Sequence, residues 1–398
     1  ILLYPKNENN STYAVFGTRY GSVDTSFRID GEEICTVPEG IAHYLEHKLF
    51  ESEDGDAFSR YAKTGASANA YTSFDSTCYL FSCSDHFYES LEILLDFVQK
   101  PYFTEETVRK EQGIIGQEIR MYDDDPQWRV MFNLLESLYH CHPVRKDIAG
   151  TVESIAKITP EYLYRCYRTF YNLHNMVLVV AGNVKADEVL KIADEKLKPC
   201  KDLSLETFFP EEPADVVKHE VTDHAAVGLP LFQVGFKSQP ASGIDLVRAE
   251  LECYVAISVL ADPASPLYRS MLEEQLINSA FSFEVFTGDG YFANLFGGES
   301  ADPYTVRDRI LAEIARCKRE GLDRAHFESV KKACYGSMLR ESNNVGATAT
   351  NLMNAHLAGV KLYDSLQILA DMTYEQVQQA LCTRFDPERV VLSVVEKE

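Results

Sequence analysis

This chain of 398 residues lacks a long uninterrupted apolar run and an excess of basic residues. Met176–Ala181 (MVLVVA) has the length of a buried strand, far short of the roughly 18 apolar residues of a membrane-spanning helix. Lysine and arginine number 38 against 61 aspartates and glutamates, which gives a net charge of −23. We therefore expect no membrane span, and neither nucleic acid nor an anionic membrane as the main partner.

The ten cysteines contain no CxxC pair and form no compact framework. Such spacing in a long chain predicts reduced, mostly buried thiols and a cytoplasmic protein. His140-Cys-His142 is a conceivable metal site, but Pro143 follows it directly and favours a loop. Because the chain begins with Ile1 rather than Met, we expect its natural start to lie outside this sequence.

The most informative motif is His43-Tyr-Leu-Glu-His47, an HxxEH pattern within Gly40–Phe50. The segment has no proline and no internal glycine, and its apolar residues recur every three or four positions, which predicts a helix. Residues four apart lie on one helical face, so both imidazoles can reach one metal ion. Glu46 shares that face and could accept a proton from a water on the metal. This is the inverzincin pattern.

A second helix is predicted over Thr104–Met121, where Glu111 and Glu118 stand two turns apart on one face. Catalytic zinc takes three protein ligands and keeps a fourth position open. One of these carboxylates could complete such a site while the other supports it. The pattern alone leaves open that both are solvated surface residues. Three isoleucines predict a partly buried helix: Ile114, Ile115 and Ile119.

HYLEH, the glutamates of EQGIIGQE and the intervening small-residue segment Gly65–Ser73 (GASANAYTS) together resemble the pitrilysin/insulysin family of zinc peptidases. The resemblance extends over essentially the whole chain and is closest to the short bacterial branch of two similar domains. It implies a Zn²⁺ cofactor with three protein ligands: His43, His47 and Glu118. It further implies that Glu46 is the general base and that Glu111 is a supporting catalytic carboxylate.

An internal repeat predicts the fold. A helix capped by Thr159 and then the strand 175–184 end the first half, and a helix capped by Thr373 and the strand 389–395 end the second. Each half is expected to be α+β, a largely antiparallel sheet with helices packed on one face. We expect a zinc-bearing peptidase domain (residues 1–197), a proline-rich linker (198–218) and a second similar domain (219–398) without the metal site.

The extended segment Ala66–Thr72 suits backbone pairing with a peptide strand. We therefore expect Ala68, Asn69 and Ala70 to bind the substrate, with Asn69 as the side chain in the site region. Small residues also serve the tight packing of an ordinary strand, and the sequence leaves these two interpretations open.

One departure from the resembling family concerns the second half. Peptide-cleaving members usually supply an Arg and a Tyr, seven residues apart, to assist the substrate carbonyl. Glu274 and Phe281 stand at the corresponding positions here. Loss of such help can cost roughly 2.7–4 kcal/mol per donor. We therefore expect a dimer, preferably with a related chain that lacks the zinc ligands and supplies the Arg and Tyr.

The sequence thus predicts a hydrolase, the zinc-dependent endopeptidase subunit that cleaves peptide bonds in peptides or unfolded segments, with Glu46 activating the water. The alternative is a catalytically weak or inactive accessory or scaffold subunit of a similar heterodimer. The missing Arg–Tyr pair favours the alternative, whereas the intact Glu46 opposes it. Zinc as a purely structural clip is disfavoured, because structural sites are four-coordinate and rich in cysteine.

Overall fold

The computed structural model describes residues 1–53 and 55–397. The chain forms two compact units, each built from three separate segments. The first unit contains Ile1–Ile119, Asp147–Phe209 and Leu339–Leu362. The second contains Arg120–Lys146, Pro210–Met338 and the chain from Tyr363 onward. Each half of the sequence therefore contributes one segment to the unit that the other half mainly builds.

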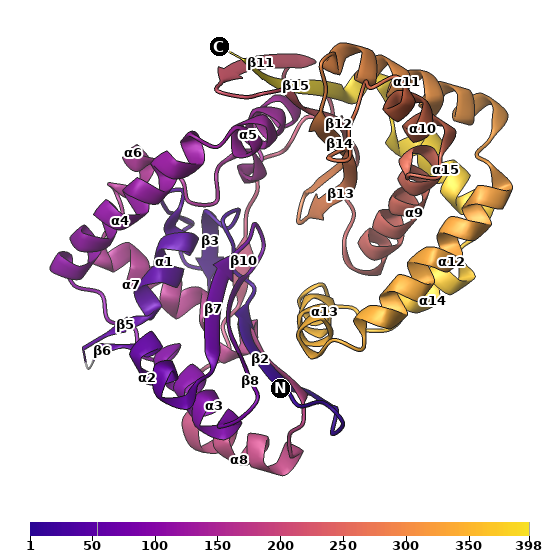
Figure 1. Cartoon of the computed structure of the whole chain (residues 1–398). Coiled ribbons are helices and arrows are strands. Elements are labelled where there is room, and N and C mark those ends of the chain that lie inside the picture. The colour runs from indigo at the N-terminus through magenta and orange to yellow at the C-terminus, as the bar shows by residue number, and fades with distance from the viewer. Residues whose placement is uncertain (54, 398) are drawn as a thin grey trace. The chain divides into compact units, whose positions relative to one another are not determined.

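The first unit is organised around a five-stranded sheet in the order β1-β9-β2-β8-β7, of which Figure 1 labels β2, β8 and β7. β1 runs parallel to β9, and every other neighbouring pair is antiparallel. The strands are β1 (Leu2–Pro5), β2 (Thr12–Thr18), β7 (Ser67–Thr72), β8 (Thr77–Cys83) and β9 (Met176–Gly182). β7 stands at one end of this order, so it is an edge strand of the sheet.

Smaller elements and helices complete the first unit. The short strands are β3 (Ser26–Ile29), β4 (Cys35–Thr36), β5 (Glu51–Ser52), β6 (Gly55–Asp56) and β10 (Leu205–Thr207). β10 lies within the segment expected to link the domains, and it pairs with β3. The helices are α1 (Ile41–Leu49), α2 (Ala57–Thr64), α3 (Phe87–Phe97), α4 (Glu105–Asp123), α6 (Val152–Ile155), α7 (Pro160–Phe170) and α8 (Ala186–Lys196), with 3₁₀ turns at Leu173–Asn175 and, in the second unit, Pro143–Arg145.

Alternating side chains of the first sheet form two separate cores, as expected for strands buried on both faces. Phe16, Phe81 and Val180 pack with the helices of the N-terminal half in the larger core. On the other face, Val15 and Val179 belong to a smaller core. Both cores are needed to keep the apolar faces of the central strands from water.

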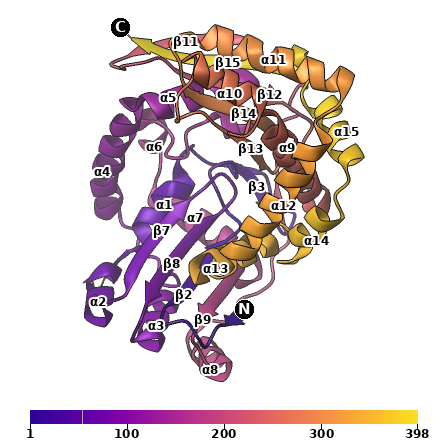
Figure 2. The same cartoon turned by 45° about the vertical axis from the view of Figure 1, so that its right-hand side comes forward.

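The smaller core is closed by α13 (Val345–Leu357), a helix from the C-terminal half of the sequence (Figure 2). The Sδ atom of Met353 lies 3.3 Å from Sγ of Cys78. A Cβ atom on Gly17 would lie only 2.8 Å from that same Sδ. Gly17 therefore lets the helix approach β2 closely.

The second unit repeats the first sheet in the order β11-β15-β12-β14-β13, again with one parallel pair at its start. The strands are β11 (Glu220–Ala225), β12 (Leu231–Lys237), β13 (Ser282–Gly288), β14 (Tyr291–Glu299) and β15 (Val390–Lys397). The helices are α5 (Pro126–Leu138), α9 (Gly243–Ala261), α10 (Pro266–Glu273), α11 (Pro303–Glu320), α12 (Arg324–Glu341), α14 (Asp364–Asp371) and α15 (Tyr374–Arg384), with a 3₁₀ turn at Pro387–Arg389. The predicted α+β fold and internal repeat are confirmed.

Each unit contains one of the two predicted helix caps, and the second unit, like the first, includes a helix from the other half of the sequence. Thr159 and Thr373 cap α7 and α15 as expected. α5, which comes from the N-terminal half, packs on β12 and β15, where a Cβ on Gly235 would lie 3.1 Å from the methyl groups of Leu134 and Leu138. Each sheet thus has its own helices on one face and one helix of the other sequence half on the opposite face.

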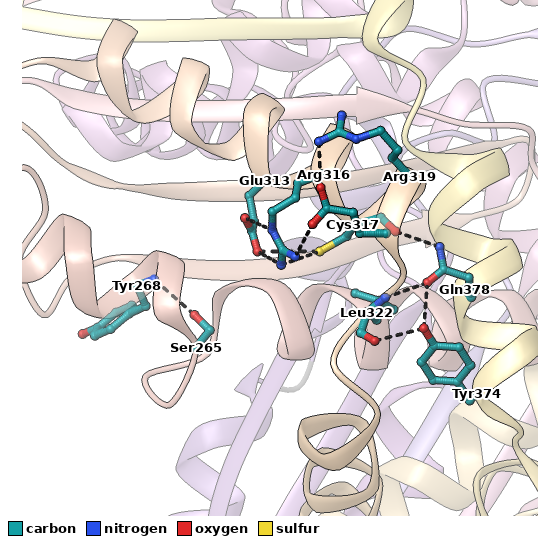
Figure 3. Close-up of polar contacts among 10 residues, drawn as sticks. Ser265, Tyr268, Glu313, Arg316, Cys317, Arg319, Leu322, Tyr374 and Gln378 are labelled. Atoms are coloured by element: carbon teal, nitrogen blue, oxygen red, sulfur yellow. Dashed lines mark hydrogen bonds and ion pairs between the residues drawn. The ribbon is translucent and has the colours of Figure 1, made fainter.

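Polar contacts join α11 to α15 in the second unit (Figure 3). The side-chain amide of Gln378 donates to the carbonyl of Cys317 at 3.0 Å and accepts from the amide of Leu322 at 2.9 Å. The hydroxyl of Tyr374 donates to the carbonyl of Leu322 at 2.9 Å. The bonds to Leu322 satisfy backbone groups just beyond the end of α11, and the bond to Cys317 adds to the one that its carbonyl accepts from the amide of Gly321 at 2.9 Å.

The residues His140-Cys-His142 form a loop, as predicted. Both ring nitrogens of His142 are engaged: Nδ1 accepts from the amide of Val144 at 3.1 Å, and Nε2 lies 3.0 Å from the carbonyl oxygen of Asp289. An imidazole with both nitrogens engaged has no lone pair to offer a metal ion. The structure therefore disfavours a metal site at this loop.

The carboxylate of Glu212, a half-buried residue, binds the backbone of the same loop. It accepts the backbone amides of residues 140, 141 and 142, each at 2.8 Å, and pairs with Nζ of the buried Lys237 at 2.6 Å. Burial raises the pKa of Glu212, but the Lys237 bond and the three amide bonds outweigh it and lower this pKa to about 2. The ionised form of Glu212 therefore stabilises the second unit.

Five of the ten cysteines are buried, namely Cys78, Cys83, Cys166, Cys253 and Cys317. All ten are free thiols. The prediction that most are buried holds for half of them, and their reduced state stays a prediction. Among the helices of the described residues, none combines the length and the apolar character that a membrane crossing requires.

We predict that Met353→Ala lowers the free energy of unfolding by about 2–5 kcal/mol, because the substitution leaves a cavity between α13 and the first sheet. Asn354→Ala, at an exposed position on the same helix, is the matched control and is expected to change it by less than about 0.5 kcal/mol. Urea unfolding of the two variants measures the difference. Equal stability of both would show that α13 does not stabilise the sheet.

We predict that Glu212→Gln is destabilising by on the order of 2–3 kcal/mol at neutral pH. The folded pKa of Glu212 is lowered from 4.5 to about 2, so its contribution is present above pH 4.5 and disappears as the pH falls toward 2. Unfolding curves of wild type and Glu212→Gln should therefore converge in acid. The exposed neighbour Glu211, changed to Gln, should show no such pH-dependent difference.

Candidate metal centre

α1 presents His43 and His47 on one face and packs its apolar residues on the larger core of the first unit. Tyr44, Leu45 and Leu49 are fully buried there. The two imidazole rings, four residues apart, have centroids 4.6 Å from each other. The helical spacing predicted from the sequence thus brings both rings to one place.

α4 presents Glu111 and Glu118 toward these imidazoles. Ile115 and Ile119 are buried and fix the orientation of the helix. Ile114, in contrast, is 46% exposed. The expected partial burial of α4 is therefore correct, but Ile114 is not part of the buried side.

His43, His47 and Glu118 form a three-residue cluster whose possible ligand atoms all lie within 4.8 Å of one another. Nε2 of His43 lies 3.7 Å from Oε1 of Glu118, and Nε2 of His47 lies 3.5 Å from its Oε2. Ligands about 2.1 Å from a tetrahedral zinc ion are roughly 3.4 Å apart, so these separations fit that ion. The donor set, two imidazoles and one carboxylate, is also that of catalytic zinc sites.

Glu111 orients His47 from behind. Its Oε1 lies 3.1 Å from Nδ1 of His47, which leaves Nε2 directed toward Glu118. Carboxylates commonly hold metal-binding imidazoles in this way. Burial works to lower the pKa of His47, but the bond to Glu111 and the charges of Glu46 and Glu118 raise it overall. Burial raises the pKa of Glu111, and the contact with His47 outweighs this and lowers it.

His43 occupies a drier position than His47. Burial, with a smaller contribution from the charge of His47, lowers the pKa of His43 to about 3. The imidazole therefore stays neutral at physiological pH and keeps a lone pair for a metal ion. Its buried Nδ1 has no hydrogen-bond partner among the described residues.

Two further contacts hold α1 against α4. The buried hydroxyl of Tyr44 donates to the carbonyl of Val108. The fully buried Lys48 pairs with Glu51, whose other oxygen lies 3.8 Å from Nζ of Lys110. These contacts tie both helices together near the cluster, so they help to set the separation of its ligand atoms.

Glu46 lies beside the cluster with its side chain almost buried. Oε2 of Glu46 accepts a hydrogen bond from the hydroxyl of Thr72 at 2.9 Å. Burial and the nearby Glu118 raise the pKa of Glu46, while Thr72 and His47 lower it, and the net shift is upward. A carboxylate with a raised pKa is better suited to accept and return a proton near neutral pH.

The residues expected to bind substrate lie on the edge strand β7. Ala68 and Ala70 are half-buried against the larger core, and Asn69 is exposed on the opposite face. Oδ1 of Asn69 accepts from the backbone amide of Ala70 at 2.9 Å. β7 packs on α1, and its last residue, Thr72, contacts Glu46.

The positions expected to carry an Arg and a Tyr lie in the second unit. Glu274 follows α10 and pairs with the guanidinium of Arg309 at 3.0 Å. Phe281 is buried and packs against Phe232 and Tyr268. Neither position offers a cation or a hydroxyl.

Sequence reasoning missed three residues that support the site: Thr72, Tyr44 and Lys48. Thr72 stood in the small-residue segment, but nothing in the sequence shows that it faces Glu46. The sequence contains one indication for Lys48: it directly follows His47, a candidate metal ligand. Its partner Glu51 follows three residues later, just beyond the end of α1.

We predict that Glu111→Gln weakens zinc binding about 10–100-fold, because the neutral amide holds Nδ1 of His47 less firmly. Competition with a chromogenic chelator measures the dissociation constant. Glu106→Gln, at an exposed position on the same helix, is the control and should bind zinc as wild type does. Equal affinities for both variants would contradict the supporting role of Glu111.

Comparisons with known proteins give matches along most of the chain. The family model described as insulinase, peptidase family M16, matches residues 36–152, and the model described as the peptidase M16 inactive domain matches residues 157–334. The uncharacterized zinc protease YmfH of Bacillus subtilis is 39% identical over 99% of this chain and 94% of its own length. A second zinc protease of that organism, YmxG, is 26% identical over 75% of this chain and 74% of its own.

Solved structures agree with the sequence relatives. The crystal structure of an M16-like peptidase from Alicyclobacillus acidocaldarius superposes with a TM-score of 0.97 at 37% identity, covering 100% of this chain and 95% of that one. A protease from Helicobacter pylori shares the fold at 17% identity, with a TM-score of 0.84 over 99% and 96% of the two chains. The relatives named zinc proteases agree with the expected Zn²⁺ cofactor. The resemblance seen in HYLEH and EQGIIGQE is confirmed, and the chain belongs to peptidase family M16, the insulinase family.

Proposed function

We propose that this chain is a zinc-dependent endopeptidase subunit acting on peptides or unfolded segments in the cytoplasm. The observation that supports it most is the cluster of His43, His47 and Glu118 with the almost buried carboxylate of Glu46 beside it. A structural zinc site would engage four protein ligands, whereas this cluster offers three. In this proposal the first unit carries the chemistry and the second has a structural role.

The proposed mechanism assigns one task to each group. His43, His47 and Glu118 would hold the zinc ion, which when bound would lower the pKa of a water molecule and polarise the substrate carbonyl. Glu46 takes the proton of the attacking water and then delivers it to the nitrogen of the leaving amine. Glu111 keeps His47 in the tautomer whose Nε2 faces the metal.

The edge strand β7 is proposed to bind the substrate backbone. Its end position in the sheet leaves one edge available for an added strand, and its small residues keep side chains from obstructing that strand. In this arrangement Ala68, Asn69 and Ala70 contact the peptide. The amide of Ala70 would exchange its bond with Asn69 for one with the substrate.

A related partner chain is proposed to complete the site. Glu274 and Phe281 offer neither the cation nor the hydroxyl that usually assists the substrate carbonyl in this family. A dimer with a chain that supplies an Arg and a Tyr would restore both. The competing function is that of an accessory subunit with little or no turnover, which the same two positions favour.

We predict that Glu46→Gln lowers the rate at which a quenched peptide library is cleaved by at least about 100-fold, because the variant lacks the general base. The variant should still bind one zinc ion per chain. Glu53→Gln, at an exposed glutamate, is the control and should cleave as wild type does. Turnover should be followed together with metal content. Wild type that binds zinc but never cleaves, with or without a partner, would establish the accessory function instead.

The same assay tests the partner. Activity of this chain mixed with a related chain that lacks HxxEH should exceed the activity of either chain alone. Removing the Arg or the Tyr of that partner should cancel the gain. A complex no more active than this chain by itself would contradict the heterodimer.

A further inference from the structure

The hydroxyl of Thr72 connects the edge strand to the glutamate beside the metal cluster. Oγ1 of Thr72 donates to Oε2 of Glu46 at 2.9 Å. The hydroxyl of Thr77, across the hairpin, donates to the carbonyl of Tyr20 at 2.8 Å and lies 3.4 Å from Oγ1 of Thr72. The Thr77 hydroxyl thus donates its hydrogen bond to Tyr20, and the Thr72 hydroxyl donates its own to Glu46.

We propose that Thr72 is a positioning residue of the peptidase reaction, which fixes Oε2 of Glu46 so that Oε1 receives the proton of the attacking water. This inference rests on the proposed function. A glutamate side chain has several rotamers, and a hydrogen bond to one oxygen selects among them. Because Thr72 ends β7, the strand proposed to bind the substrate also orients the base.

The second unit offers an internal comparison. Thr287 on β13 stands five residues before its cross-strand partner Phe292, just as Thr72 stands five residues before Thr77. Its hydroxyl lies 3.4 Å from Oε2 of Glu250 on α9. The same edge-strand position thus contacts a helix glutamate in both units, but the three-residue metal cluster found among the described residues lies in the first unit. The longer Thr287 contact is also the weaker one.

The test compares Thr72→Val, which removes the hydroxyl at nearly constant volume, with Thr72→Ser, which keeps it. We expect kcat of Thr72→Val to fall about 10–100-fold, the range for loss of a hydrogen bond to a charged group. KM and zinc affinity should stay within about twofold of wild type, because Thr72 is argued to act through Glu46. Thr72→Ser should restore most of kcat. Thr287→Val is the matched control and should leave kcat unchanged.

Two results of this comparison would overturn the inference: wild-type kcat in Thr72→Val, or an equal loss of kcat in Thr287→Val. A loss of zinc affinity in Thr72→Val that accounts for its lost activity would also overturn it, since Thr72 would then hold the cluster rather than the base. If wild type itself shows no Glu46-dependent turnover, alone or with a partner, the proposed function fails instead.

A second measurement tests the hydrogen bond between Thr72 and Glu46 through protein stability, without any need for catalytic activity. In zinc-free protein, Thr72→Val should raise the unfolding equilibrium constant about tenfold when Glu46 is present and less than about twofold in a Glu46→Ala background. Equal effects in both backgrounds would show that the two side chains do not interact, and would overturn the inference even in an inactive protein.

Discussion

The packing of α1 against α4 is the constraint on which the candidate site depends. These helices lie far apart in the sequence, and each supplies only part of the candidate metal cluster. Tyr44, buried in α1, and Ile115, buried in α4, hold the two faces together. Two imidazoles and several carboxylates then share a poorly hydrated space, where charges are costly unless they are paired. A divalent cation would relieve that cost, and the raised pKa of Glu46 reflects the same shortage of water.

The two units show how one architecture can serve two purposes. Both sheets have the same strand order, and both end in a hairpin whose edge strand lies against a helix. In the first unit that helix carries the histidines and Glu46. In the second, α9 carries Glu250 facing Thr287 but no histidine. The repeated scaffold therefore does not require the candidate metal cluster, whose three residues lie on α1 and α4.

Much of this arrangement was predictable from local patterns. The helix around His43, the caps at Thr159 and Thr373, and the strand at the end of each half all depend on short-range periodicity and capping. The contact of Thr72 with Glu46 was not predictable, because it joins residues whose proximity is set by tertiary packing alone. For the same reason, the sequence could not predict that α5 and α13 each pack on the sheet formed mainly by the other half of the chain. Their apolar faces indicate that they are buried, but not which sheet they cover.

The exchange of these helices has a consequence for biosynthesis. A ribosome releases all strands of the first sheet, the last of which is β9, well before it releases α13, which covers one face of that sheet. Until then Val15, Val179 and their neighbours remain without their final cover. Apolar surface that waits in this way is prone to wrong association and to capture by chaperones. The nascent chain must therefore tolerate a long interval in which its first sheet is assembled but unfinished.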